Sequence, residues 1–370
     1  MKIGIVTSYF FPWYGGITEH VHNQYMELKR RGHDVRVVTP FDGGNMVRPE
    51  ELIRIGAPLP VKCNGSTASI PLIKQRKRRV GGTLARERFD ILHLHQPLFC
   101  RLSLAFLNEI GHMKRRGELP PAVVGTFHSC GGGRERLLVS CFLALYLRRF
   151  RAAFDCKVAV SVAARDFIRT VLPGHYEIVP NGVDVDRFAR RKEGLERFDD
   201  GCINVLFVGR LEPRKGIETL LRAIPLVRGR TSRPFRLIVV GNSTCDRRYR
   251  GLIDGMSDTD VVFVGQVSSD DLPGYYRSAH IFCSPAACGE SFGIVLLEAM
   301  AAGLAIVGGD NPGYRRVIQP GVNGILIKPN DHHGLAASLA HLMDSDEERR
   351  RLSAGAARDC ARYRWENILG

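Results

Sequence analysis

The sequence predicts an α/β protein with two doubly wound domains, each a parallel sheet covered by helices on both faces. Short continuous apolar runs rich in Val and Ile alternate with stretches of helical apolar periodicity, which is the order typical of such sheets. The alternation runs through twice, with a break at residues 180–182 and a new apolar run from Ile203. A chain of 370 residues is long enough for two domains that each bury a core.

The expected elements follow this alternation along the chain. We expect strands at residues 2–7, 34–39, 91–95, 122–127 and 157–161, and then at residues 203–208, 236–240, 260–264, 280–283, 305–308 and 324–327. Helical periodicity is present at residues 19–31, 217–227, 294–302 and 334–343. We therefore expect two Rossmann-like domains with a cleft between them, and ligands of such sheets bind beyond the carboxyl ends of the strands.

Composition excludes several classes of protein and points to an anionic partner. A hydrophobic fraction of 44% excludes a disordered chain. The longest uncharged apolar run, residues 137–147, has 11 residues, whereas a membrane-spanning helix needs about 20. Ten cysteines without a CxxC pair favour buried thiols in a reducing cytosol over zinc or disulfides. The net charge of +15 fits nucleic acid, acidic lipid or phosphorylated substrates.

Three loops after expected strands carry candidate chemistry, and the first contains Gly15 and Gly16. The glycine pair lies where a strand gives way to a helix, so free backbone N–H groups and the helix dipole favour a phosphate there. An ordinary strand–helix turn is an equally good interpretation of a lone pair of glycines. The loop lacks the GxGxxG fingerprint, which argues against a dehydrogenase.

The second loop, GRLEPRKG at residues 209–216, follows the first strand of the second half and opens a helix. It places Arg210 and Lys215 at the carboxyl end of that strand. A forked guanidinium and a compact ammonium together suit a diphosphate. The alternative, a solvated basic turn, is commoner for a lysine alone than for this combination.

The third loop places two carboxylates on either side of a helix start. Glu290 precedes the helix and Glu298 lies within it, eight residues later, which corresponds to roughly 12 Å along a helix axis. Between them, the amides of residues 292–294 form an anion site. Two hydroxyl-binding carboxylates flanking an anion site match a nucleotide sugar. As alternatives, Glu290 could be a helix-start acid and Glu298 a surface residue, but the neighbours of Glu298 are apolar.

Together these motifs and the segment Asn181-Gly182-Val183-Asp184 resemble the retaining glycosyltransferases of family 4, group 1. The resemblance covers nearly the whole chain and extends to the phosphatidyl-myo-inositol mannosyltransferases within that family. It implies the two-domain GT-B fold. It also implies an N-terminal acceptor-binding domain (residues 1–180), a linker (181–200) and a nucleotide-sugar-binding domain (201–355), with a C-terminal helix at about residues 356–370 packing back on the first domain.

The resemblance also implies roles for individual residues. Gly16 would contact the donor diphosphate, and Arg210 and Lys215 would neutralise it as it leaves. Glu290 would bind hexose hydroxyls and Glu298 the ribose. The full donor-binding set comprises Gly15, Gly16, Arg210, Lys215, Glu290, Ser291, Phe292, Gly293, Ile294 and Glu298, the acceptor-side set comprises Tyr9, Asn64 and Ser66, and the catalytic set comprises His128, Arg210, Lys215 and Glu290.

His128 would lie beside the transferred sugar and stabilise its developing positive charge, although a satisfied core histidine is the commoner fate of a lone His. Retention in this family resembles front-face attack, so we expect no strong nucleophile. We expect no metal requirement, although a divalent metal is possible. His93 and His95 share a strand face without an evident third ligand, and residues 184–186, which resemble a metal-binding DxD, are better interpreted as a turn.

The basic run Lys74, Arg76, Lys77, Arg78 and Arg79 is either a solvated face or a membrane-docking patch. Similar enzymes dock a basic patch of the first domain on anionic phospholipid, and residues 137–147 could insert shallowly. We therefore expect a cytoplasmic protein that is peripheral on the inner face of the cell membrane.

The leading functional hypothesis is a retaining hexosyltransferase that transfers mannose from GDP-mannose to a lipid or lipid-linked acceptor such as phosphatidylinositol, in glycolipid biosynthesis. The first alternative keeps the fold but uses a UDP-hexose and a soluble or polysaccharide acceptor. The second is a non-catalytic anion- or nucleic-acid-binding protein. No nucleic-acid-binding signature appears in the sequence, so we expect no nucleic acid partner.

Overall fold

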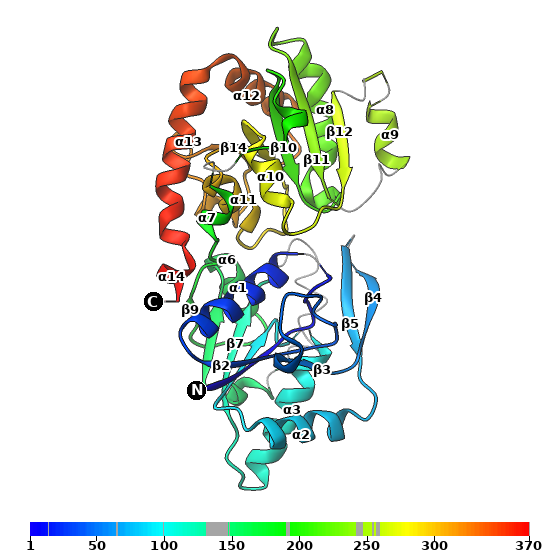
Figure 1. Ribbon diagram of the computed structural model, residues 1–370, viewed down its shortest axis with the longest axis vertical. Helices are drawn as coiled ribbons and strands as arrows, with labels where there is room; N and C mark the ends of the chain where they lie inside the picture. The colour runs from blue at the N-terminus through cyan, green and yellow to red at the C-terminus, as the bar shows by residue number, and fades with distance from the viewer. Residues whose placement is uncertain are drawn as a thin grey trace. The chain divides into compact units, whose positions relative to one another are not determined.

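The computed structural model describes residues 1–13, 15–63, 66–98, 100–130, 147, 149–189, 193–241, 247–253, 255–256 and 260–369. The chain divides into two compact units, Met1–Asn181 with Leu369–Gly370, and Gly182–Ile368 (Figure 1). Each unit is a parallel sheet with helices, so the α/β class and the doubly wound sheets expected from the sequence are confirmed. No helix in the described part of the chain is long and apolar enough to cross a membrane.

The first unit is built on a seven-stranded sheet of order β3-β2-β1-β6-β7-β8-β9, in which all neighbouring strands are parallel. Its strands are β1 (Lys2–Val6), β2 (Asp34–Thr39), β3 (Leu52–Arg54), β6 (Ile91–His95), β7 (Ala122–Phe127), β8 (Cys156–Ala159) and β9 (Glu177–Ile178). A separate antiparallel hairpin joins β4 (Ala57–Cys63) to β5 (Ser66–Leu72). The helices include α1 (Gly16–Arg30), α2 (Arg76–Glu87), α3 (Arg101–Arg115) and α6 (Val162–Arg169), with 3-10 turns at Pro49–Glu51 and Arg151–Ala153.

Alternating residues of β1 and β6 enter two different cores. Ile3 and Ile5 pack with Val21 of α1, whereas Leu92 and Leu94 pack in the cluster that includes α2, α3 and α6. Because the side-chain period of a strand is two, the remaining residues of β6 face α1. This alternation directs two histidines of β6 toward α1.

The second unit is built on a six-stranded parallel sheet of order β12-β11-β10-β13-β14-β15. Its strands are β10 (Ile203–Val208), β11 (Phe235–Val240), β12 (Val261–Gly265), β13 (Ile281–Ser284), β14 (Ala305–Gly309) and β15 (Ile325–Ile327). The helices are α7 (Val185–Phe188), α8 (Ile217–Arg228), α9 (Arg247–Ile253), α10 (Leu272–Arg277), α11 (Ile294–Ala301), α12 (His332–Asp344), α13 (Asp346–Cys360) and α14 (Trp365–Ile368). Short 3-10 turns lie at Glu196–Phe198, Pro213–Lys215, Tyr314–Arg316 and Ala361–Tyr363.

The helices of the second unit cover both faces of its sheet (Figure 1). Phe207 of β10 packs in a cluster with residues of α8 and α12, and Leu206, its neighbour, packs in a cluster with residues of α10, α11 and α13. Opposite faces of one strand therefore anchor two helical layers, which is the doubly wound arrangement.

Two segments differ in their elements from the sequence-based expectation. The stretch at residues 181–200 contains α7 and the turn Glu196–Phe198, and both Phe188 and Phe198 are buried in the core of the second unit. A single helix at about residues 356–370 was expected, but α13 ends at Cys360 and α14 is a separate short helix. The helix is interrupted because Arg364 adopts an extended backbone and pairs with Val183 as a β-bridge.

Candidate functional site

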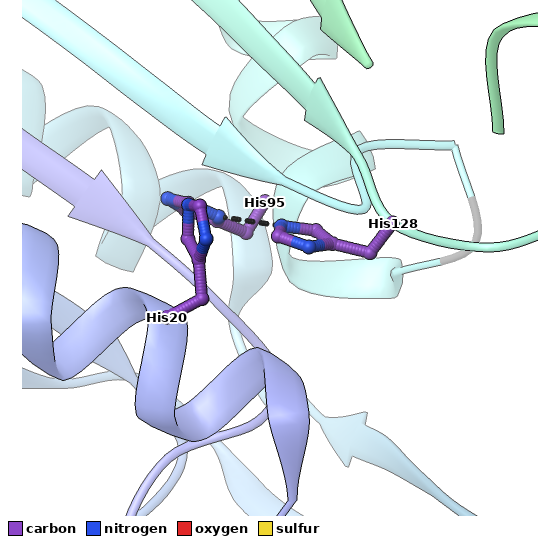
Figure 2. A group of neighbouring side chains, drawn as sticks. All are labelled: His20, His95 and His128. Atoms are coloured by element: carbon purple, nitrogen blue, oxygen red, sulfur yellow. Dashed lines mark hydrogen bonds between the residues drawn. The ribbon is translucent and has the colours of Figure 1, made fainter. Parts of the chain in front are cut away.

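A cluster of buried histidines lies on the α1 side of the first sheet (Figure 2). His20 comes from α1, His95 from the end of β6, and His128 from the residue that follows β7. The ring centroids of His20 and His128 are 4.8 Å apart, and those of His95 and His128 are 5.2 Å apart in a stacked arrangement. All three side chains are buried. The structure therefore gives His128 two histidine neighbours instead of leaving it alone.

Further polar groups extend this cluster along β6. His93 stacks on His95 with ring centroids 4.6 Å apart. The amide of Gln24, one turn after His20 on α1, bridges His93 Nδ1 (3.0 Å) and His95 Nε2 (2.8 Å). His20 Nδ1 donates to Asn181 Oδ1 at 2.8 Å. The part that His20 and Gln24 take in the cluster could not be predicted from the sequence, because it depends on the packing of α1 against the carboxyl end of β6.

Burial holds these histidines in their neutral form. Loss of solvent lowers the pKa of His20 to about 4, against a smaller opposing contribution from its hydrogen bond to Asn181. Burial likewise lowers the pKa of His93 to about 3 and moves the pKa values of His95 and His128 well below the usual histidine value. At neutral pH each ring therefore carries one N–H and one lone pair.

The three histidines of Figure 2 are also a possible metal site. One ring nitrogen from each of His20, His95 and His128 lies within 4.8 Å of the others, and neutral imidazoles are common zinc ligands. In the structure, however, His95 Nδ1 and His128 Nε2 are hydrogen-bonded to each other at 2.9 Å. Ring nitrogens that share a proton in this way already have a partner, so hydrogen bonding explains the arrangement directly.

The loop after β1 contains the predicted glycine pair. Gly15 precedes α1 with an extended backbone (φ 164°, ψ 166°), and Gly16 is the first residue of the helix. Thr18 closes the loop because its hydroxyl donates to the carbonyl of Trp13 at 2.6 Å. Tyr9 is partly exposed in the same loop. Of the other acceptor-side candidates, Asn64 lies outside the described residues, and Ser66 begins β5 but its side chain is not among those described.

In the second unit, alternating charges form one network at the carboxyl ends of β10 and β13. Lys215 Nζ and Arg214 Nη1 lie 2.7 and 2.9 Å from the same oxygen, Oε1 of Glu290. Arg214 Nε and Arg210 Nη1 each lie 2.9 Å from an oxygen of Glu212. The predicted residues Arg210, Lys215 and Glu290 are therefore brought together, and two further residues, Glu212 and Arg214, connect them.

Arg214 is the centre of this network. Burial acts to lower its pKa, but the carboxylates of Glu290 and Glu212 outweigh burial and raise it above the usual arginine value. The guanidinium therefore stays charged and fixes both carboxylates. Arg214 lies within the GRLEPRKG segment, but its role could not be predicted from the sequence because only the folded chain brings Glu290 to it.

The loop before α11 is held by tight packing. Gly293 has φ 98°, and a Cβ on it would lie 2.5 Å from the Tyr314 ring, so only glycine fits there. Phe292 is buried and its ring contacts that of Tyr363 edge-on at 5.7 Å. The backbone of Ser291, Phe292, Gly293 and Ile294 thus leads into the N-terminus of α11, the end of a helix that favours anions.

Glu298 lies inside α11 and is buried. It accepts a hydrogen bond of 2.6 Å from the hydroxyl of Tyr276. Burial and the nearby Glu298 carboxylate raise the pKa of Tyr276 well above the usual tyrosine value, so the hydroxyl keeps its proton and remains a donor. Glu298 is therefore a buried carboxylate with a polar partner, which agrees with the apolar neighbours in its sequence.

The acidic residues that resemble DxD serve local structure. Asp184 caps α7 by accepting from the backbone N–H of Arg187 at 3.1 Å. Asp186 accepts two hydrogen bonds from the guanidinium of Arg364, at 2.9 and 3.1 Å. These bonds are those expected of a turn that anchors the C-terminal segment.

The basic run lies at the start of α2. Lys74, Arg78 and Arg79 are exposed, whereas the side chains of Arg76 and Lys77 are outside the described set. The apolar run at residues 137–147 also lies outside the described residues, apart from Leu147, which is buried.

The lowered pKa values predict that acid destabilises the fold. Above about pH 6.5 these histidines are neutral in both folded and unfolded chains. As the pH falls below that value, the unfolded chain binds protons that folded His20 and His93 do not bind until about pH 4 and 3. Stability is therefore lost by up to ~1.4 kcal/mol per pH unit for each such histidine. Urea unfolding between pH 7.5 and 5 measures this slope.

Two matched variants test whether the buried histidines cause this dependence of stability on pH. His93→Gln should make the slope shallower, whereas His175→Gln, which removes an exposed histidine, should leave it unchanged. Equal slopes for wild type and His93→Gln would show that the buried histidines are not its source.

Two family models divide the chain between them. The model described as Glycosyltransferase Family 4 matches residues 14–187, and the model described as Glycosyl transferases group 1 matches residues 190–359. The chain is 34% identical to the phosphatidyl-myo-inositol mannosyltransferase of Mycolicibacterium smegmatis, over 100% of this chain and 91% of that protein. It is 29% identical to the enzyme of the same name from Propionibacterium freudenreichii, over 100% and 92% of the two chains.

Solved structures show the same fold at lower identity. Sucrose-phosphate synthase from Thermosynechococcus elongatus matches with a TM-score of 0.75 and 21% identity, covering 99% of this chain and 96% of that one. The Anabaena protein HepE in complex with UDP-glucose matches with a TM-score of 0.74 and 17% identity, covering 100% and 97%. The family models, the full-length relatives and the two doubly wound units agree with the resemblance seen in the sequence. The chain belongs to the family 4, group 1 glycosyltransferases and is a glycosyltransferase with the GT-B fold.

Proposed function

We propose that this glycosyltransferase is a retaining mannosyltransferase that transfers mannose from GDP-mannose to phosphatidylinositol or a related lipid acceptor. The observation that carries the donor side of the proposal is the charge network of Arg210, Glu212, Arg214, Glu290 and Lys215. The mannose and the inositol lipid come from the names of relatives that match over the whole chain.

The network has the composition that a sugar diphosphate requires. Three cations face two carboxylates, so a diphosphate adds the negative charge that the cluster lacks. Arg210 and Lys215 can each exchange a carboxylate oxygen for a phosphate oxygen, and hexose hydroxyls can then donate to Glu290. Charge-assisted bonds of this kind are the strong ones in proteins. The N-terminus of α11 supplies backbone N–H groups beside the same residues.

The proposed mechanism needs no protein nucleophile. Arg210 and Lys215 stabilise the negative charge that grows on the departing diphosphate, which is electrostatic catalysis by groups already in place. The departing phosphate accepts the proton of the acceptor hydroxyl as that oxygen attacks the same face of the sugar. His128 lies beside the transferred hexose in this proposal, Gly15 and Gly16 contact the donor, and Glu298 binds the ribose. Tyr9, Asn64 and Ser66 remain candidates for the acceptor.

A second donor class has its own support. The solved structures of HepE contain UDP and UDP-glucose, and nothing in Glu290 or Glu298 selects a nucleobase. A UDP-hexose-dependent enzyme acting on a soluble or polysaccharide acceptor is therefore the alternative. A non-catalytic anion-binding protein is disfavoured by membership of an enzyme family along the whole chain.

A thermal-shift panel of GDP, UDP and ADP tests the donor. We expect GDP and GDP-mannose to raise the melting temperature and the other two nucleotides to have little effect. Stabilisation by UDP alone would replace mannose with a UDP-hexose. No shift with any nucleotide would contradict the assignment of the charge network as a donor site.

Substitution of Lys215 tests the role of the network in the reaction. Lys215→Ala should lower kcat by about two orders of magnitude, or ~3 kcal/mol, the scale for one preorganised group that stabilises charge. Glu290→Ala should also lower turnover sharply, because the transferred ring loses a hydroxyl acceptor. Initial rates of mannose transfer from GDP-mannose to phosphatidylinositol measure both. Arg222→Ala is the control, since Arg222 pairs with Glu218 on the exposed side of α8 in the same unit. Near-normal rates in Lys215→Ala would refute the diphosphate assignment.

We also propose that the start of α2 binds an anionic membrane surface, on the inner face of the cell membrane, as the lipid acceptor requires. Lys74, Arg78 and Arg79 are exposed there, and each cation near an anionic leaflet contributes about 1 kcal/mol. Together with Arg76 and Lys77, they place five cations within six residues.

Charge reversal tests this surface. Arg78→Glu with Arg79→Glu should weaken co-sedimentation with vesicles that contain phosphatidylglycerol by more than about tenfold, since at least two favourable charges are lost. The control is Arg350→Glu with Arg358→Glu, which makes the same change in net charge at exposed positions of α13. Equal binding of the wild type to neutral and anionic vesicles would remove the electrostatic proposal.

A further inference from the structure

Five polar side chains of the first unit form a continuous chain of hydrogen bonds, here called the histidine relay. His93 Nε2 is bonded to Thr126 Oγ1 (2.6 Å), and His93 Nδ1 to Gln24 Nε2 (3.0 Å). Gln24 Oε1 is bonded to His95 Nε2 (2.8 Å), and His95 Nδ1 to His128 Nε2 (2.9 Å). The relay thus begins at β7, crosses β6 by way of α1, and ends on His128.

The amide of Gln24 determines the direction of every bond in the relay. Its oxygen can only accept, so His95 must carry its proton on Nε2 and present a lone pair at Nδ1. That lone pair must accept a hydrogen bond from the N–H of His128 at Nε2. Neutral His128 therefore carries its own lone pair on Nδ1. The protonation of His93 is determined in the same way. The amide nitrogen of Gln24 donates to His93 Nδ1, so His93 carries its proton on Nε2.

The relay has one alternative state with the same bonds. If the amide of Gln24 turns by half a rotation, each donor becomes an acceptor and each acceptor a donor, and the Thr126 hydroxyl can serve in either role. In that state His128 carries its proton on Nδ1. Gln24 is the member of the relay whose donor and acceptor atoms are fixed by covalent structure, so its orientation selects between the two states.

The outer end of the relay is held in place and leaves one ring nitrogen of His128 without a hydrogen bond among the described residues. The backbone N–H of His128 donates to Gln96 Oε1 at 2.8 Å, and Gln96 itself has a positive φ of 51°, a conformation that a non-glycine residue adopts at some cost. Among the described residues, Nδ1 of His128 has no hydrogen-bond partner. A ligand hydroxyl is the group that would complete the relay there.

We propose that Gln24 is a positioning residue that holds His128 as its Nε2–H tautomer, so that Nδ1 accepts a hydrogen bond from a hydroxyl of the transferred sugar. This inference rests on the proposed function in placing a sugar beside His128. Because burial lowers the pKa of His128, Nδ1 is a weak base, and its role in this proposal is that of a hydrogen-bond acceptor. His95 has the same positioning role, one step closer to the ligand.

The tautomers can be observed without any substrate. Long-range nitrogen–proton correlation spectra of the full chain, labelled with 15N-histidine at pH 7.5, report which ring nitrogen carries the proton. Single His→Gln variants assign the signals of His93, His95 and His128. We expect all three to be Nε2–H tautomers. An Nδ1–H tautomer at His128, or an average of the two forms, would overturn the inference.

Two variants of Gln24 then test its control of the relay. Gln24→Glu offers only acceptors, so His95 and His128 should keep their tautomers while His93 changes to Nδ1–H, and kcat/KM should stay within about threefold of the wild type. Gln24→Met is similar in length but makes neither bond, so His95 and His128 should become tautomeric mixtures. Its kcat/KM should fall about tenfold, the scale of one lost hydrogen bond.

The outcomes separate this inference from the proposed function. Both variants should keep the thermal shift by GDP, because the charge network is untouched. If Gln24→Met retains single Nε2–H tautomers and full kcat/KM, Gln24 does not position His128. If the wild type binds no nucleotide and transfers no mannose, the proposed function fails, whereas the tautomer spectra still decide whether Gln24 sets the relay.

Discussion

The register of parallel strands with a two-residue side-chain period is the constraint on which the first unit depends. Residue 93 of β6 is paired with Ile5 of β1 on one side and with Val124 of β7 on the other. Residues at the same register share a face of the sheet. His93, His95 and Thr126 therefore all face α1, and a shift by one residue would bury Leu92 and Leu94 there instead. The buried polar relay follows from this register.

The second unit uses loop geometry in place of a buried relay. Its charged residues follow the carboxyl ends of β10 and β13, strands that are neighbours in the sheet, so residues about 75 positions apart in the chain meet in one network. Close packing fixes these loops: a Cβ on Gly216, which has φ 75°, would lie 2.1 Å from the carbonyl oxygen of Pro285. Lys215 is thereby held against the loop that carries Glu290.

The sequence predicted most of the fold because the central strands of both sheets are continuous apolar runs between helical periods. It did not predict the β4–β5 hairpin, whose strands include three prolines and many polar residues, nor α2, which is strongly basic at its start. The motifs predicted Arg210, Lys215 and Glu290 as donor-binding residues, and the structure brings the three into one network. Gln24, His20 and Arg214 were missed, since each acquires its partner from an element distant in the chain, and local periodicity contains no information on that pairing.

The alternation of charge in the second unit has a consequence for selectivity. Arg210, Arg214 and Lys215 carry their own counter-ions, Glu212 and Glu290. A simple anion such as inorganic phosphate would draw Lys215 away from Glu290 and leave that buried carboxylate with Arg214 as its remaining partner in the network, and the loss of a hydrogen bond is costly for a buried group. A molecule that carries both phosphates and hydroxyls compensates for this loss, because its phosphates bind the cations while its hydroxyls donate to Glu290. If the network binds a sugar diphosphate as proposed, the same charges would also discriminate against the abundant small anions of a cell.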